Sequence, residues 1–313
     1  MIPEAVTRVL ENMKKVVVGK TDVLELAVVA LLCEGHILIE DVPGIGKTTL
    51  AKALARSVGC SFNRIQCTPD LLPSDVTGIY FFDQKKSEFV FRPGPVMSNI
   101  VLADEINRAT PRTQSSLLEA MEERQVTVDG LTMPLPRPFL VIATQNPVEL
   151  QGTFPLPEAQ LDRFMLRLEI GYPDKDEEDT MLLRFEKDNP LENLTDVVTA
   201  EDILELKRIA RDVYVEQSVR RYILEITGRT RHHPSVQLGA SPRASLALYK
   251  AAQAYALATG RDYVIPDDVK RLAVPVIGHR IILNTEAYLH RRSKEILIEE
   301  ILASIPIPVE DQD

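Results

Sequence analysis

The first half of the chain alternates short apolar runs with longer segments whose apolar residues recur at helical spacing. Four apolar runs predict buried strands, at residues 36–40, 100–103, 139–144 and 165–170. Helices are predicted between them, one at 47–58 and one that follows the capping residue Thr110 and ends at residue 123. Strands that are apolar throughout are typical of a sheet covered on both faces. The pattern therefore predicts an α/β fold in which helices sandwich a parallel sheet.

Two stretches interrupt this alternation with strand-like residues. Residues 76–95 hold two aromatic, β-prone runs around a polar turn. Residues 125–138 hold two shorter runs around Asp129-Gly130, a dipeptide typical of tight hairpin turns. Both stretches predict hairpins inserted between elements of the core, and projecting loops of this kind commonly carry specificity on a rigid scaffold.

From residue 171 onward the apolar spacing is helical throughout. Helices are predicted after Thr199, after Ser241 and Ile265, each of which precedes a proline, and after Ser293. No internal repeat or low-complexity linker separates the two halves of the chain. We therefore expect two domains, an α/β core at residues 1–170 and an all-α lid at residues 171–313.

Composition narrows the class of protein. The 313 residues carry a formal net charge of −10 and no block rich in Lys and Arg, which argues against a non-specific nucleic-acid binder. Three cysteines without metal-ligand or disulfide-type spacing favour a reducing compartment. The chain shows neither a secretory signal pattern nor an apolar run of the ~20 residues that a membrane span needs. We expect a cytoplasmic protein.

The most informative motif lies between the first predicted strand and the helix after it. Gly44 and Gly46 leave room for backbone N–H groups to close on phosphate oxygens, Lys47 adds a mobile ammonium, and the hydroxyl of Thr48 is suited to Mg²⁺. Asp41 is a departure, because the strict pattern of such loops has glycine there. The loop residues expected to contact a nucleotide are Pro43, Gly44, Ile45, Gly46, Lys47, Thr48 and Thr49.

Polar residues follow the next two predicted strands. Asp104, at the end of an apolar run, is placed to hold Mg²⁺, and Glu105 to accept a proton from an attacking water. Asn146 ends the next run, where a neutral amide can orient that water. An isolated Asp-Glu pair is more often a solvated turn, and Asn-Pro is a common turn dipeptide. Their position after buried strands favours the catalytic interpretation.

Two arginines are further candidates. Arg163 precedes the fourth predicted strand, and Arg243 begins a helix in the second domain. Each taken alone is an ordinary surface or ion-pair arginine. Phosphoryl transfer, however, depends on cations that meet the developing charge, and an arginine finger contributes ~10³–10⁵ in rate. Arg108 and Arg112 are weaker candidates, and the five histidines show no metal-ligand spacing.

These motifs, in this order, resemble the MoxR family of AAA+ ATPases over nearly the whole chain. The matching segments are EDVPGIGKTTLA (40–51), RIQCTPDLLPSDVTG (64–78), FRPGPV (91–96), VLADEINRATPRTQSSLLEAMEE (101–123), VIATQNPVELQGTFPLPEAQLDRF (141–164) and GASPRA (239–244). The family tolerates an acid at the position of Asp41. The resemblance implies an AAA+ P-loop core with a helical lid, which binds ATP and Mg²⁺ and hydrolyses the ATP.

The resemblance also implies individual roles. Lys47 is similar to the phosphate ligand, Thr48 and Asp104 to the Mg²⁺ ligands, and Glu105 to the catalytic base. Asn146 resembles the first sensor, Arg243 the second sensor that reports from the lid, and Arg163 an arginine finger that acts on a neighbouring subunit.

Further implications concern the adenine site and the assembly. Val18 and Gly19 are expected beside the adenine, in a segment where Lys20 stands in place of the family's usual glutamine. The hairpins at 76–95 and 125–138 match the helix-2 insert and the pre-sensor-1 insert of this branch. A finger that acts in trans implies a ring, usually a hexamer.

The resemblance implies a chaperone-like activity on client proteins, often in partnership with von Willebrand factor A domain proteins. Two alternatives remain open. One is a nucleic-acid motor like the related minichromosome maintenance helicases, which share both inserts; the acidic balance disfavours it, although Lys85 and Lys86 lie at the first hairpin tip. The other is a chelatase-type subunit that drives metal insertion into a tetrapyrrole.

Overall fold

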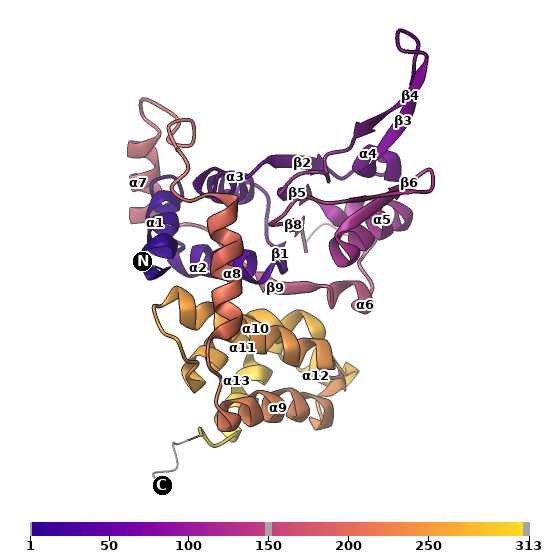
Figure 1. Cartoon of the computed structure of the whole chain (residues 1–313). Coiled ribbons are helices and arrows are strands. Elements are labelled where there is room, and N and C mark those ends of the chain that lie inside the picture. Colours follow the sequence, from indigo (N-terminus) through magenta and orange to yellow (C-terminus); the bar gives the residue numbers. More distant parts are fainter. Residues whose placement is uncertain (1, 148–151, 309–313) are drawn as a thin grey trace.

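A five-stranded parallel sheet forms the centre of the first half of the chain (Figure 1). The computed structural model describes residues 2–147 and 152–308, so residues 148–151 of the matched segment 141–164 lie outside the described residues. The strand order is β2-β5-β8-β1-β9, and every neighbouring pair is parallel. The strands are β1 (His36–Glu40), β2 (Phe62–Gln66), β5 (Ile100–Asp104), β8 (Leu140–Gln145) and β9 (Phe164–Leu168). The predicted parallel sheet is confirmed.

Helices cover both faces of the sheet, as predicted. Along β1, Ile37 and Ile39 join an apolar cluster with α1 (Ile2–Lys14), α2 (Thr21–Cys33) and α3 (Lys47–Ser57). The intervening Leu38 joins a second cluster, built with α4 (Pro73–Thr77) and α5 (Pro111–Glu123). Successive side chains of a strand point to opposite faces, so one apolar run supplies two layers of core.

Strand β2 has no counterpart among the predicted strands. Only Ile65 is buried on it, whereas Asn63, Arg64 and Gln66 are exposed. It is an edge strand, so it lacks the apolar run by which a central strand can be predicted.

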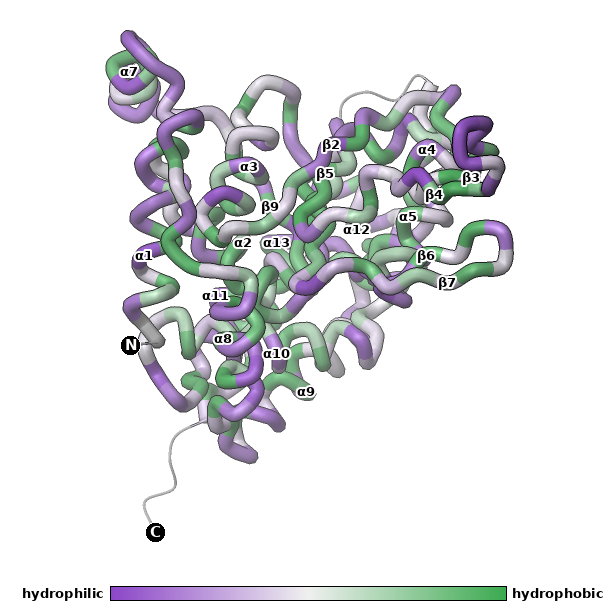
Figure 2. Tube along the Cα trace, turned by 45° about the horizontal axis from the view of Figure 1, so that its top comes forward, coloured by the Kyte–Doolittle hydropathy of each residue, from purple (hydrophilic) through white to green (hydrophobic). Residues whose placement is uncertain are grey.

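Both predicted hairpins are present. Strands β3 (Gly78–Asp83) and β4 (Glu88–Pro93) form the first, and β6 (Gln125–Val128) and β7 (Leu131–Pro134) the second. The first hairpin extends away from the body of the molecule (Figure 1), and its hydrophobic strands lead to a hydrophilic tip (Figure 2). Its base admits no side chain, because a Cβ on Gly78 would lie 2.4 Å from the Arg92 carbonyl oxygen and one on Gly94 would lie 2.3 Å from that of Val76.

The second half is helical, as predicted. Hydroxyl caps begin two of its helices: Thr199 Oγ1 accepts from the Asp202 N–H (3.2 Å) and Ser293 Oγ from the Ile296 N–H (3.2 Å). It also contains a two-stranded antiparallel sheet, β10 (Val236–Leu238) with β11 (Ile282–Leu283), that helical spacing did not predict. The helices are α7 (Lys175–Arg184), α8 (Ala200–Asp212), α9 (Gln217–His232), α10 (Pro242–Ala258), α11 (Pro266–Ile277), α12 (Thr285–Leu289) and α13 (Lys294–Ser304).

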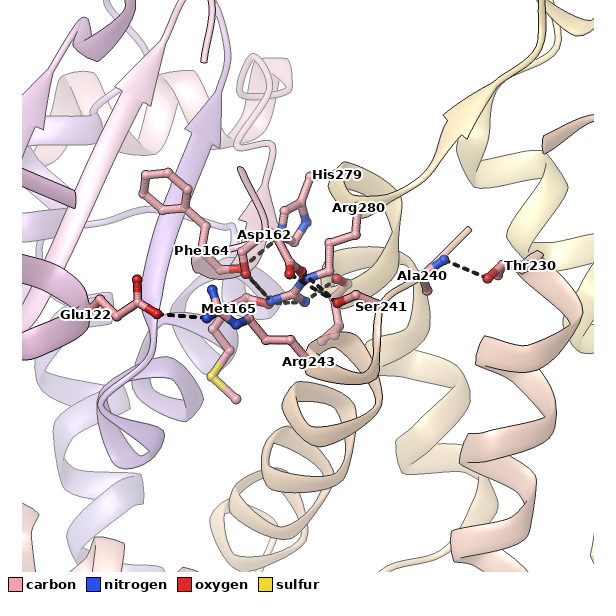
Figure 3. Close-up of polar contacts among 11 residues, drawn as sticks. Glu122, Asp162, Phe164, Met165, Thr230, Ala240, Ser241, Arg243, His279 and Arg280 are labelled. Atoms are coloured by element: carbon pink, nitrogen blue, oxygen red, sulfur yellow. Dashed lines mark hydrogen bonds and ion pairs between the residues drawn. The ribbon is translucent and has the colours of Figure 1, made fainter. Parts of the chain in front are cut away.

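Buried polar contacts fasten this helical part to the sheet (Figure 3). The guanidinium of Arg280, 2% exposed, donates to Asp162 Oδ1 (2.8 Å) and to the carbonyl oxygen of Phe164 (2.7 Å) at the start of β9. Ser241, at the start of α10, donates its hydroxyl to the same carboxylate (3.1 Å). One apolar cluster also runs from α1–α3 into α8–α11. The core is thus continuous, and the division into residues 1–170 and 171–313 stays a prediction.

Within residues 2–147 and 152–308, every helix is too short or too polar to cross a lipid bilayer.

We predict that His36 makes stability pH-dependent. Its buried Nδ1 accepts from the Val141 N–H (3.0 Å) and its Nε2 donates to the Met121 carbonyl oxygen (3.0 Å), which fixes the neutral ring. Burial lowers its pKa from 6.5 to about 4. The unfolded chain therefore binds the proton first, so the stabilisation is complete above pH ~6.5 and is lost as the pH falls toward 4.

Urea unfolding at pH 7 and at pH 5 tests this prediction. The wild-type protein should lose about 2 kcal/mol more free energy of unfolding over that interval than His36→Gln. His290→Gln, at an exposed position, is the control and should behave like the wild type. Equal losses in the wild type and His36→Gln would contradict the assignment.

Candidate functional site

The loop between β1 and α3 has the backbone conformation of a phosphate-binding loop. Gly44 (φ 87°) and Gly46 (φ 90°) are both left-handed, and a Cβ on either would meet no other atom within 4 Å. Backbone conformation, and not lack of space, therefore calls for glycine. Helix α3 begins directly at Lys47, so its unpaired N–H groups and its positive dipole end face the loop.

Lys47 lies among negative groups. Its Nζ donates to the Asp41 carbonyl oxygen (2.5 Å). Partial burial lowers the pKa of Lys47, while the charges of Asp41, Asp104 and Glu105 act in the opposite direction and raise it. An ammonium in this setting is held ready for an anionic ligand such as a phosphate.

Thr144 orders the two acids at the end of β5. Its hydroxyl donates to Asp104 Oδ1 (2.6 Å) and accepts from the Glu105 N–H (2.9 Å). Glu105 has a left-handed backbone (φ 56°), which is rare for a residue with a side chain and is typical of functional sites. The structure thus brings Asp104 and Glu105 together at the edge of the sheet where the phosphate loop also lies.

Neighbouring β2 supplies partners that the sequence analysis missed. Arg64 forms an ion pair with Asp104 Oδ2, and Gln66 Nε2 lies 3.4 Å from Glu105 Oε2. Arg64 and Gln66 are two residues apart, so both project to the same side of the strand. This polar alternation was the only available signal, and it is weak because any exposed edge strand shows it.

Asn146 follows β8, which lies between β5 and β1. The register pairs Glu40 with Gln145, so Asn146 reaches the sheet edge between Asp104 and the phosphate loop. The expected closeness of the Asn146 strand to the Asp104 strand is confirmed by the pairing of β5 with β8.

The donor set at this edge fits Mg²⁺. Thr48 and Asp104 offer a hydroxyl and a carboxylate, which are hard oxygen ligands. Across the residues that the structure describes, no group of three or more His, Cys, Asp or Glu side chains is arranged to hold a metal ion. Mg²⁺ is typically held by one or two protein oxygens together with substrate phosphates and water, so this sparse set suits an ion that arrives with a nucleotide.

A cavity of about 300 Å³ adjoins the phosphate loop. Its lining is mostly apolar and includes Val17, Val18, Ile45, Ile170, Met181 and Phe185. A Cβ on Gly19 would lie 1.8 Å from Glu177 Oε1, so glycine permits the close approach of α7. An apolar slot next to a phosphate site suits a flat nucleobase. Val18 lines this slot and Gly19 follows it in the chain, and their place beside an adenine stays a prediction.

Arg163 and Arg243 lie together but away from this site. One carboxylate holds both. Glu122 Oε2 is 3.1 Å from Arg163 Nε, and Glu122 Oε1 is 2.8 Å from Arg243 Nη2 (Figure 3). All three residues line a second cavity of about 310 Å³ with His36, the first residue of β1. The phosphate loop follows the other end of β1, roughly 13 Å away along the strand. The arginines therefore lie near the opposite edge of the sheet from Lys47.

Comparisons with known proteins agree on one family. The model of the ATPase family associated with various cellular activities (AAA) matches residues 36–166, and the AAA lid domain model matches residues 228–301. The uncharacterized protein YeaC of Bacillus subtilis is 55% identical over 303 residues, which cover 97% of this chain and 95% of YeaC. Chaperone MoxR1 of Mycobacterium tuberculosis is 42% identical over 310 residues, which cover 96% of this chain and 82% of that protein.

Solved structures give the same result. The crystal structure of a candidate ATPase from Cytophaga hutchinsonii matches with a TM-score of 0.93 at 41% sequence identity. The match covers 98% of this chain and 96% of that chain. The whole arrangement of sheet and lid is therefore shared with that protein.

We predict that Thr144→Val separates nucleotide binding from turnover. The substitution keeps the shape of the side chain but removes the hydroxyl that orders Asp104 and the Glu105 backbone. ATP hydrolysis should fall about 10–100-fold, while the dissociation constant for nucleotide should change by less than about threefold. Thr132→Val, whose hydroxyl pairs with Thr127 on the exposed hairpin, is the control. Unchanged turnover in Thr144→Val would refute this role.

Proposed function

We propose, since the chain belongs to the MoxR family of AAA+ ATPases, that its ATP hydrolysis depends on Mg²⁺, takes place in a ring and drives the remodelling of client proteins. Hydrolysis of ATP follows from the family itself. The single observation that supports the ring is the position of the arginine pair, near the opposite edge of the sheet from the phosphate loop.

Each residue of the phosphate edge has a defined task in this proposal. Backbone N–H groups of the loop and the ammonium of Lys47 bind the β- and γ-phosphates. Thr48 and Asp104 hold Mg²⁺, which neutralises charge on the phosphate oxygens. Glu105 takes the proton of the attacking water, and Asn146 orients that water.

The arginine pair acts on a nucleotide bound to a neighbouring subunit. Glu122 engages Arg163 through Nε and Arg243 through Nη2. A guanidinium carries five N–H donors, so each arginine keeps donors for a phosphate that arrives from outside. In this proposal Arg243, like Arg163, therefore acts on the nucleotide of the neighbouring subunit. A subunit alone lacks these cations at its own phosphate loop, and a closed ring supplies them at every interface.

Two observations support an action on client proteins. A relative that is 42% identical over nearly the whole chain carries the name chaperone. In addition, the projecting β3–β4 hairpin exposes Ile79 (43%), Phe81 (42%), Phe82 (51%) and Phe89 (70%), in a region that Figure 2 shows as hydrophobic. Exposed apolar side chains on one projecting element suit contact with another protein. Partners with a von Willebrand factor A domain remain part of the proposal through the family resemblance.

We predict that Lys47→Ala and Glu105→Gln fail at different steps. Lys47→Ala removes the cation at the phosphates, so nucleotide affinity should fall at least about 100-fold. Glu105→Gln removes the base, so ATP should still bind while turnover falls at least about 100-fold. Calorimetric titration and a phosphate-release assay measure the two effects. Lys52→Ala, on the same helix, is the control, and equal loss of binding in both variants would refute the division of roles.

We predict that Arg163→Ala and Glu105→Gln complement each other in mixed rings. Each homogeneous variant should be nearly inactive. In a mixture, some interfaces join an intact base to an intact finger, so activity should return to a sizeable fraction of the wild-type rate. Arg243→Ala mixed with Glu105→Gln should behave in the same way, and Arg208→Ala, at an exposed ion pair, should leave activity unchanged. Absence of rescue in rings shown to exchange subunits would overturn action in trans.

A further inference from the structure

The side chain of Asp41 holds a distant part of the backbone. Its Oδ2 accepts from the N–H groups of Ile170 (2.8 Å) and Gly171 (2.7 Å), while its Oδ1 accepts from the Val42 N–H (2.9 Å). Strand β9 ends at Leu168, two residues before its predicted end, and these contacts begin immediately after it. Hydrogen bonds to a charged acceptor are among the stronger ones in proteins. The residue that breaks the strict loop pattern thus ties the phosphate loop to the chain entering the lid.

Lys20 holds the same segment from the other side of the cavity. Its Nζ donates to the Tyr172 carbonyl oxygen (2.9 Å) and lies 3.4 Å from Glu177 Oε2. Glu177 in turn accepts from the Asp174 N–H (3.0 Å) at the start of α7. The Lys20 side chain is 20% exposed and the Glu177 side chain 24%, so solvent screens this ion pair only in part.

The segment held in this way is one wall of the cavity beside the phosphate loop. Ile170, Gly171, Tyr172 and Pro173 line that cavity together with Pro43–Gly46, Val16–Val18 and Lys20. The phosphate-binding groups lie on the loop itself and on α3, so the base of a bound nucleotide depends on this wall whereas its phosphates do not.

We propose that Asp41 and Lys20 form a clasp that positions residues 170–177 against the nucleobase side of the cavity. The two side chains set the affinity for the base-bearing part of a purine nucleotide, and they link its binding to the entrance of the lid. The inference rests on the proposed nucleotide site and deepens it. Asp41, which stands where the strict loop pattern has glycine, and Lys20 thus hold one and the same segment.

The test compares two ligands that share their phosphates. Titration calorimetry measures Mg-ADP and inorganic tripolyphosphate on the wild type, Asp41→Asn and Lys20→Gln. Asp41→Asn should weaken ADP about tenfold and Lys20→Gln about threefold, because each loses one charged hydrogen-bond partner. Tripolyphosphate, which does not reach the wall, should bind all three proteins within about twofold. Asp267→Asn and Lys270→Gln, from an exposed ion pair on α11, are the matched controls and should leave both affinities unchanged.

A second measurement reports the clasp directly. Amide hydrogen exchange of Ile170 and Gly171 in the ligand-free protein should be faster in Asp41→Asn than in the wild type, since the amide of asparagine replaces a carboxylate as their acceptor. Equal loss of ADP and tripolyphosphate affinity would overturn the proposal by assigning Asp41 to the phosphates alone. Unchanged ADP affinity together with unchanged exchange would overturn it as well. A wild-type protein that binds neither ligand would instead refute the nucleotide site, which is a separate outcome.

Discussion

Parallel strands all end at the same edge of their sheet, and this constraint organises the rest of the molecule. The phosphate loop, Asp104, Glu105 and Asn146 meet because β1, β5 and β8 are neighbours that run in one direction. The same geometry leaves the residues at the starts of the strands at the far edge, where His36 and the arginine pair lie. The arginine pair therefore lies about one strand length, roughly 13 Å, from the phosphate loop of its own chain. The proposed division of the site between subunits rests on this strand direction.

Sequence patterns were sufficient for the features that depend on neighbouring residues. The apolar runs of β1, β5 and β8, the Thr110 cap and the Asp129-Gly130 turn each have a local physical cause, and each was predicted. Strand β2 was missed because its burial is limited to Ile65. The contacts of Thr144, Glu122 and Asp41 were also missed, since their partners lie 39 to 130 residues away along the chain. Neither the composition nor the spacing of residues predicts such distant pairs. The roles of the candidate residues stay predictions, and the separation of Arg243 from Lys47 required coordinates.

Several buried polar groups make contacts between the sheet and the lid. Arg280 is nearly inaccessible, yet its donors reach Asp162 and the carbonyl oxygens of Phe164 and Val276. Burial lowers the pKa of Arg280 to about 10, and the charge of Asp162 opposes that shift. A buried ion pair contributes little net stability compared with apolar packing, but it tolerates few alternative geometries. Here the pair fixes the position of two arginines. Asp162 directly precedes Arg163, and Ser241, which also bonds Asp162, lies two residues before Arg243. Arg163 and Arg243 thus lie close in sequence to residues that one contact network holds.

The glycine pair at the base of the β3–β4 hairpin marks the boundary between positions that admit only glycine and positions whose side chains can vary. Backbone oxygens lie so close to Gly78 and Gly94 that any side chain there must displace the main chain. The aromatic residues farther along both strands meet no such limit, because they stand in solvent. The base of the hairpin is therefore restricted to glycine, whereas its exposed side chains can be exchanged. In related proteins, a change of about a dozen hairpin residues would alter this exposed surface and leave the sheet that carries the phosphate loop unchanged.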